Sequence, residues 1–246
     1  MRNAISWAVA GMAMALVACG SSDADDAELE PEVIVEPYDG STGLDPISSA
    51  AAYPSGPYGV AVGDVLQDAT FFGYKNAEAS VSGELESFSL SDFYDPDGEK
   101  GIDLIYVSIS AAWCPPCQAE AKALPEMIES LAKDGLGVAF FQDLYEGGEV
   151  GAPGTQRDLD RWLKRYQLPF PVVIDPKAKM NAYFDRNSIP YSLVVDAKTM
   201  KILGTEAGFD SRKVELKDAD GNVVQDENGE ARMVYPLELF IRKHLP

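Results

Sequence analysis

Residues 102–117 read IDLIYVSISAAWCPPC, and this stretch decides the fold. Its first nine residues are mostly apolar and β-branched, which is typical of a central strand that is covered on both faces. The Trp-Cys-Pro-Pro-Cys sequence at 113–117 follows almost directly. We therefore expect a buried strand that leads into a helix, with two cysteines at the junction.

The two cysteines, Cys114 and Cys117, form a Cys-x-x-Cys pair. Cys114 should lie at the helix N-terminus, where the helix dipole favours a thiolate. The spacing places the second sulfur one helical turn away, close enough to attack a mixed disulfide on the first. Pro115 and Pro116 lack a backbone N–H, so the first helical donor to a Cys114 thiolate is the Cys117 amide. The pattern predicts that Cys114 attacks and Cys117 resolves.

The cysteine pair has two alternative interpretations besides redox chemistry, a zinc site and a structural disulfide. A zinc site needs four ligands, and besides the pair the chain offers only Cys19 and the distant His244. A purely structural disulfide is the second alternative, although so short a loop stabilises little. We therefore expect a redox-active disulfide, no metal and no other cofactor.

Strand and helix patterns alternate along the rest of the chain. An N-terminal hairpin is expected from the apolar runs at 69–74 and 85–90, with one helical turn at 91–94. Further strands are expected at 136–142, 171–175, 191–196 and 201–206. Helices are expected from 117 to a stop at Gly135, with a kink at Pro125, and at 155–166, 177–184 and 236–244.

The segment 212–234 is predicted to be a β insertion. Asp220-Gly221 and Asn228-Gly229 are hairpin signals that break its alternating segments. Its acidic residues do not fit a calcium loop, because Val223 stands where the sharp turn needs glycine. Turn chemistry explains them better.

The N-terminal 55 residues predict export and a membrane anchor. Arg2 precedes an apolar stretch at 8–18 that is shorter than the roughly 20 residues needed to span a bilayer, as in a secretion signal. Leu16-Val17-Ala18-Cys19 resembles the bacterial lipobox, in which the cysteine is lipidated and becomes the mature N-terminus. We expect a signal peptide at 1–18 and an acidic flexible tether at 19–55 that is anchored by lipid on Cys19. The alternative is an ordinary signal peptide that leaves Cys19 as a free thiol.

The rest of the chain, 56–246, is predicted to form one domain. It can bury a sizeable core, because 46% of the whole chain is hydrophobic. The formal net charge of −20 makes nucleic acid an unsuitable partner.

A strand, Trp-Cys-Pro-Pro-Cys, a kinked helix and Ile189-Pro190 before another strand together resemble the TlpA/ResA-like branch of the thioredoxin-fold redoxins. The resemblance covers 56–246. It implies an α/β thioredoxin fold: a central mixed β-sheet flanked by helices, with the N-terminal β-hairpin and the C-terminal β insertion added.

The resemblance also implies roles for individual residues. Pro190 corresponds to a cis-proline that faces the disulfide, and Ile189 before it offers its backbone to an incoming peptide. Glu120 corresponds to a glutamate that accepts and returns protons, although simple dipole complementation would also explain it. Substrate is expected to contact Trp113, Pro115, Pro116 and Ile189. Ser108 departs from the family, which has Asn or Asp at its position, so it cannot supply an acid or base.

These features predict an extracytoplasmic thiol–disulfide oxidoreductase whose partners are protein thiols and disulfides, including cytochrome-maturation substrates. Electrons would come from a membrane donor, because nothing in the chain binds a flavin or nicotinamide. Two alternatives stay open. A peroxiredoxin-like thiol peroxidase would need Thr or Ser where Ala111 stands, and a copper-delivery or other binding module would need a better-placed histidine than His244.

Overall fold

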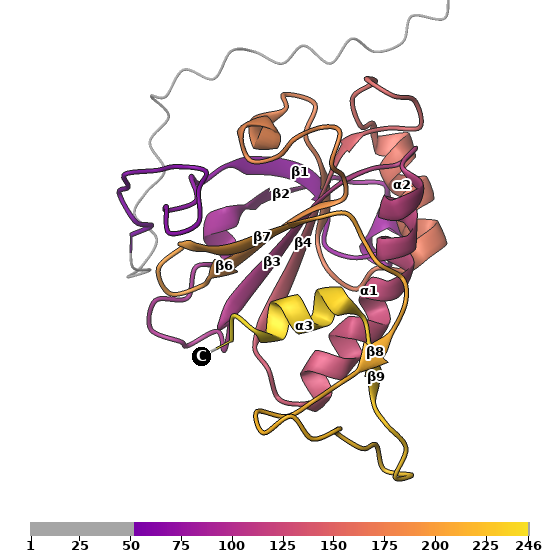
Figure 1. Cartoon of the computed structure of the whole chain (residues 1–246). Coiled ribbons are helices and arrows are strands. Elements are labelled where there is room, and N and C mark those ends of the chain that lie inside the picture. The colour runs from indigo at the N-terminus through magenta and orange to yellow at the C-terminus, as the bar shows by residue number, and fades with distance from the viewer. Residues whose placement is uncertain (1–51, 246) are drawn as a thin grey trace, which may run out of the picture. The chain divides into compact units, whose positions relative to one another are not determined.

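The computed structural model describes residues 52–245, and Figure 1 shows this part of the chain in colour. The predicted signal peptide, Cys19 and nearly all of the predicted tether lie outside the described residues, so these expectations stay predictions. None of the helices in the described range combines the length and the apolar character that crossing a membrane requires.

The centre of the domain is a seven-stranded sheet in the order β2-β1-β5-β4-β3-β6-β7. Its strands are β1 Thr70–Tyr74, β2 Glu86–Ser89, β3 Leu104–Ala111, β4 Val138–Glu146, β5 Val172–Ile174, β6 Tyr191–Asp196 and β7 Ile202–Ala207. The helices are α1 Pro115–Lys133, α2 Gln156–Tyr166 and α3 Pro236–Arg242, with 3-10 turns η1 Ala79–Ser82, η2 Leu90–Phe93 and η3 Lys179–Ala182.

The central strand β3 is buried along its whole length, as its apolar sequence predicts. It is parallel to β4, which follows it through α1, and antiparallel to β6. β7 continues the sheet antiparallel to β6, and the chain then returns in α3. A β-α-β unit followed by a β-β-α unit in one mixed sheet is the thioredoxin fold, so the expected fold class is confirmed.

The predicted N-terminal hairpin is present. β1 and β2 are antiparallel, and β1 extends the central sheet by pairing with β5. Packing begins slightly before the predicted domain start at 56, because the Tyr53 hydroxyl donates to the Leu66 carbonyl at 2.7 Å and its ring packs edge-on against Tyr94.

Helices α1 and α2 begin where the sequence indicates. Cys114 is the N-cap of α1, and the helix continues through Pro125 to Lys133. A capping box between Thr155 and Asp158 starts α2, and Leu159, Trp162 and Leu163 form its buried face. β4 extends four residues beyond the predicted end at 142, because every residue through Glu146 is buried and the sharp turn begins only at Gly147.

The predicted insertion at 212–234 forms a short two-stranded ribbon, β8 Val214–Glu215 with β9 Met233–Val234. Its two loops are closed by Asp218 and Asp226, whose carboxylates accept bonds from backbone amides at 2.8 Å to 3.0 Å. The turn chemistry inferred from the sequence explains these acids.

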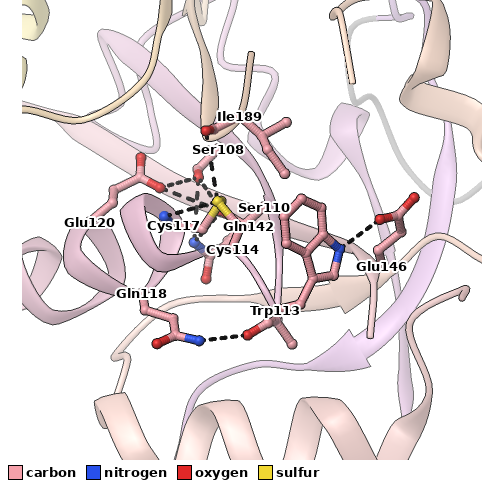
Figure 2. Close-up of a disulfide and its surroundings, with 11 residues drawn as sticks. Ser108, Ser110, Trp113, Cys114, Cys117, Gln118, Glu120, Gln142, Glu146 and Ile189 are labelled. Carbon is pink, nitrogen blue, oxygen red and sulfur yellow. Dashed lines mark hydrogen bonds between the residues drawn. A yellow bond between two sulfur atoms is a disulfide. The ribbon is translucent and has the colours of Figure 1, made fainter. Parts of the chain in front are cut away.

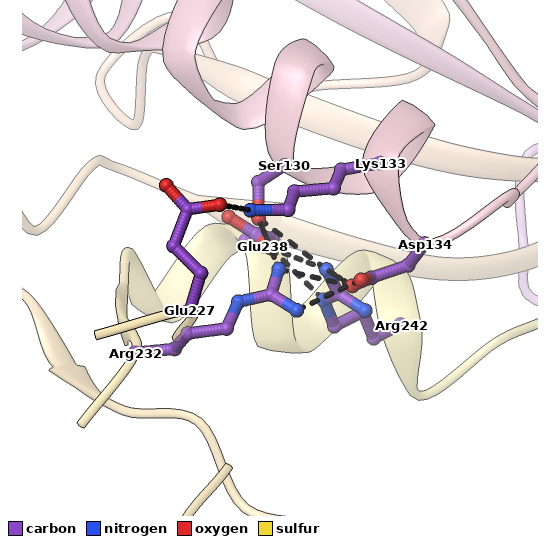
Figure 3. A network of polar contacts seen from close by, with 7 residues as sticks. All are labelled: Ser130, Lys133, Asp134, Glu227, Arg232, Glu238 and Arg242. Atoms are coloured by element: carbon purple, nitrogen blue, oxygen red, sulfur yellow. Dashed lines mark hydrogen bonds and ion pairs between the residues drawn. The ribbon is translucent and has the colours of Figure 1, made fainter. Parts of the chain in front are cut away.

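A polar cluster joins the insertion and α3 to the C-terminal end of α1 (Figure 3). The Asp134 carboxylate accepts hydrogen bonds from the Arg232 guanidinium at 2.8 Å and from the Arg242 guanidinium at 2.6 Å. The bond from Arg232 is the main cause of the lowered pKa of Asp134. Ser130 and Arg242 both donate to Glu238 at 2.7 Å. The far end of the helix that carries the cysteines is thus held by two other segments.

Candidate active site

The two cysteines of the Cys-x-x-Cys motif form a disulfide at the junction of β3 and α1 (Figure 2). Their Cα atoms are 5.2 Å apart. The Cys117 amide lies 3.3 Å from Cys114 Sγ, so the first free N–H of the helix points at that sulfur. This geometry would stabilise a Cys114 thiolate after reduction.

Both sulfurs are covered in the disulfide form. Cys114 is 2% exposed and Cys117 is 0% exposed, so both residues are shielded from solvent in this redox state. The reason is that neighbouring segments close over the junction. Pro115 and Pro116 are exposed and form the surface beside the disulfide.

The segment before β6 faces the disulfide. Cys114 Sγ lies 3.7 Å from the carbonyl oxygen of Ile189, and the Ile189–Pro190 peptide bond is cis, as the resemblance implied. Residues far apart in the sequence thus meet at one place, where a peptide lying along Ile189 would reach Cys114.

Trp113 is half-buried beside the pair and is fixed by Glu146, at the end of β4. Its indole N–H donates to Glu146 Oε2 at 2.7 Å (Figure 2). Arg186 lies 3.4 Å from the other oxygen of the same carboxylate. Glu146 was not a sequence candidate. The anchored indole covers one side of the junction.

Glu120 is fully buried one turn beyond Cys117. Ser108 donates to its Oε2 at 2.9 Å and Ser110 at 3.4 Å (Figure 2). The Tyr106 hydroxyl donates to Oε1. Burial raises the pKa of Glu120 from 4.5 to about 7, against the lowering effect of these three hydrogen bonds. Glu120 can therefore gain or lose a proton near neutral pH.

Several residues of this polar network were not predicted from the sequence. Ser108 was recognised only as unable to act as a base, whereas it donates to the glutamate. Polar side chains at alternate positions of an apolar strand share one face, and this signal could have revealed Tyr106 and Ser110. Gln142 and Ser192 interrupt other apolar strands in the same way.

Comparison with known protein families assigns the chain to one of them. Residues 65–225 match the AhpC/TSA family. The chain belongs to this family. Like the TlpA/ResA-like proteins that the motif resembles, AhpC/TSA proteins are redoxins, so the predicted membership is confirmed.

This AhpC/TSA member is also similar to individual proteins. It is 24% identical over 92 residues to the thiol–disulfide oxidoreductase ResA of Bacillus cereus, covering 37% of this chain and 48% of ResA. It therefore spans about half the length of that curated relative.

Two solved structures are similar to this AhpC/TSA member. A putative thiol:disulfide interchange protein DsbE from Chlorobium tepidum has 21% identity and a TM-score of 0.44, with coverage of 62% of this chain and 89% of that one. StoA from Bacillus subtilis has 22% identity and a TM-score of 0.39, with coverage of 57% and 88%.

Proposed function

We propose that this protein is an extracytoplasmic, lipid-anchored thiol–disulfide oxidoreductase that exchanges disulfides with protein substrates. The observation that carries the proposal is the Cys114–Cys117 disulfide at the start of α1, with Ile189 on its outer side and the buried Glu120 behind it. The similarity to ResA supports the same reaction class.

In the reducing direction, the Cys114 thiolate attacks one sulfur of a substrate disulfide and expels the other as a thiolate. Cys117 then transfers its proton to Glu120 and attacks Cys114 Sγ in the mixed disulfide. The bond between Cys114 and the substrate breaks, and the second substrate sulfur leaves as a thiolate. The pair is oxidised to a disulfide and the substrate receives two electrons, so an external dithiol, such as a membrane donor, must reduce the pair again.

Reduction of insulin and of hydrogen peroxide, measured on the same preparation with dithiothreitol as the electron source, tests this function. We expect insulin to be reduced at a rate that the protein accelerates, and peroxide to be consumed no faster than with dithiothreitol alone. Peroxide turnover that exceeds insulin turnover would favour the thiol peroxidase. Activity with neither substrate would favour the binding module.

The lipid anchor gives a separate prediction for Cys19. We expect the full-length protein, expressed in a bacterial host, to enter the detergent phase on phase partitioning, because Leu-Val-Ala-Cys resembles the lipobox at which a cysteine is acylated. Cys19→Ser should remain aqueous or keep its signal peptide, whereas Cys114→Ser should partition like the wild type. Detergent partitioning of a Cys19→Ser protein that has lost its signal peptide would exclude the anchor.

A further inference from the structure

The proposed mechanism leaves a proton on a carboxyl group that has no exposure. Glu120 is 0% exposed, and Cys117, which would supply the proton, is equally buried. One proton must leave Glu120 in each oxidation of the pair. A route to solvent is therefore required, and the hydrogen bonds around Glu120 define its direction.

On the Oε2 side of Glu120, the hydrogen bonds all donate in the direction of the carboxylate. Trp162 can only donate, and its indole N–H donates to Gln142 Oε1 at 2.7 Å. The Gln142 amide nitrogen must then face Ser108 and Ser110, at 3.4 Å and 3.2 Å. Each serine hydroxyl accepts a hydrogen bond from the Gln142 amide and can donate its own proton to Glu120 Oε2. A proton placed on Oε2 would therefore face two hydroxyl groups that already donate to this oxygen.

The other carboxylate oxygen, Oε1, has a reversible partner. The Tyr106 hydroxyl lies between Glu120 Oε1 and the Ser192 hydroxyl, which is 2.8 Å away. When Glu120 is ionised, Tyr106 donates to it and accepts from Ser192. When Glu120 is protonated, it donates to the Tyr106 oxygen, and Tyr106 donates to Ser192. Glu120 Oε1 and the Tyr106 hydroxyl are hydrogen-bonded to each other in both protonation states, as buried polar groups require.

The next strand carries a second carboxyl on the same face. Glu206 on β7 lies directly opposite Ser192 on β6, a register in which the Cβ atoms are about 5 Å apart. Within the described residues, its Oε2 is buried and has no hydrogen-bond partner, although the residue as a whole is half-buried. β7 is the edge strand of the sheet, so Glu206 stands between the buried network and the surface.

We propose that Tyr106 and Ser192 are positioning residues that carry the proton of Glu120 toward Glu206 and solvent, by reversal of the Tyr106 hydroxyl between its two partners. The proposal rests on the proposed proton transfer from Cys117 to Glu120. The titratable groups along the route are Cys117 and Glu120 on α1, Tyr106 on β3 and Glu206 on β7. No net charge is created, because one proton enters at Glu120 and one leaves at Glu206.

The two chemical steps are separated with dithiobis(nitrobenzoate), an aromatic disulfide that yields a coloured thiolate. The protein is reduced in a Cys19→Ser background, so that only the active-site pair reacts. The first thiolate is released when Cys114 attacks, and the second when Cys117 resolves the mixed disulfide. The rate of each phase is measured between about pH 5 and pH 9 for wild type, Tyr106→Phe, Ser192→Ala and a control.

Tyr106→Phe removes a donor to the ionised carboxylate, so the pH midpoint of the second phase should rise by about one unit. The midpoint shift alone lowers its rate at pH 7 about fivefold, with the first phase unchanged. Because Tyr106 lies on the proposed route, its loss should also lower the plateau of the second phase. Ser192→Ala keeps the Tyr106 donor, so it should lower that plateau and leave the midpoint in place.

The matched control is Tyr145→Phe. Tyr145 is also buried, and its side chain is not part of the hydrogen bonds that join Glu120, Tyr106 and Ser192. We expect this variant to behave as the wild type in both phases. In an Glu120→Gln background, Tyr106→Phe should slow the second phase no further, because the proton acceptor is already gone.

Two results would overturn the proposal. One is a Tyr106→Phe profile identical to that of Tyr145→Phe. The other is a Tyr106→Phe effect that persists undiminished in the Glu120→Gln background, which would show a merely structural role. Failure of the proposed function itself would look different, because the wild type would then release no second thiolate at any pH.

Discussion

Cys117→Ser should turn this protein into a trap for disulfide substrates. The Cys114 thiolate would still attack, helped by the amide at position 117, which lies 3.3 Å from its sulfur and is retained by serine. The mixed disulfide would then persist, because the resolving thiol is absent. With insulin as the substrate and in a Cys19→Ser background, we expect nearly all of the protein to form a covalent adduct on non-reducing gels.

The matched variant is Cys114→Ser, which should lose essentially all capture. Cys117 is fully buried and belongs to the first turn of α1, so a substrate sulfur cannot reach it directly. Equal capture by the two variants would contradict the assigned roles. Both sulfurs are covered in the disulfide form. The test therefore compares how well a substrate disulfide reaches each thiol in the reduced protein, where Cys114 lies at the helix end.

The second large effect is a pH-dependent loss of stability that originates at Glu120. Burial raises its pKa in the folded protein from 4.5 to about 7. Between these values the folded protein keeps a proton that the unfolded chain has released. The free energy of unfolding must therefore fall as the pH rises from about 4.5 through 7, by about 3 kcal/mol in total for this group. Below pH 4.5 the penalty disappears.

Glu120→Gln should remove this dependence, because glutamine resembles the protonated carboxyl and can donate to Tyr106. Urea unfolding of the oxidised proteins would measure it. Relative to wild type, the variant should gain about 3 kcal/mol between pH 4.5 and pH 8. Burial also raises the pKa of Asp143, but that group is present in both proteins and its effect cancels in the difference.

The control is Glu129→Gln, which removes an exposed carboxyl from the same helix. Its stability difference from wild type should stay constant across this pH range. If Glu120→Gln also gave a constant difference, Glu120 would titrate in the folded protein as it does in the unfolded chain. The proton-transfer role would then lose its physical basis.

Local sequence was enough to locate the redox pair and its supporting elements. An apolar run followed by Cys-Pro-Pro-Cys specifies a buried strand and a helix start, because burial and the missing proline N–H groups act on neighbouring residues. The hairpin, the capping box at Thr155 and the turns at Asp218 and Asp226 are local for the same reason. Pro190 and Glu120 were found only through the resemblance to a family.

The polar network depended on tertiary structure. Tyr106, Gln142 and Ser192 come from three strands, and only the pairing register brings them to one face of the sheet with Glu120. The raised pKa of Glu120 likewise needs the helix and the sheet together, since desolvation depends on what covers a group and not on its neighbours in sequence. The sequence by itself determined where the two sulfurs meet; long-range packing decided how a proton can reach and leave the carboxyl group behind them.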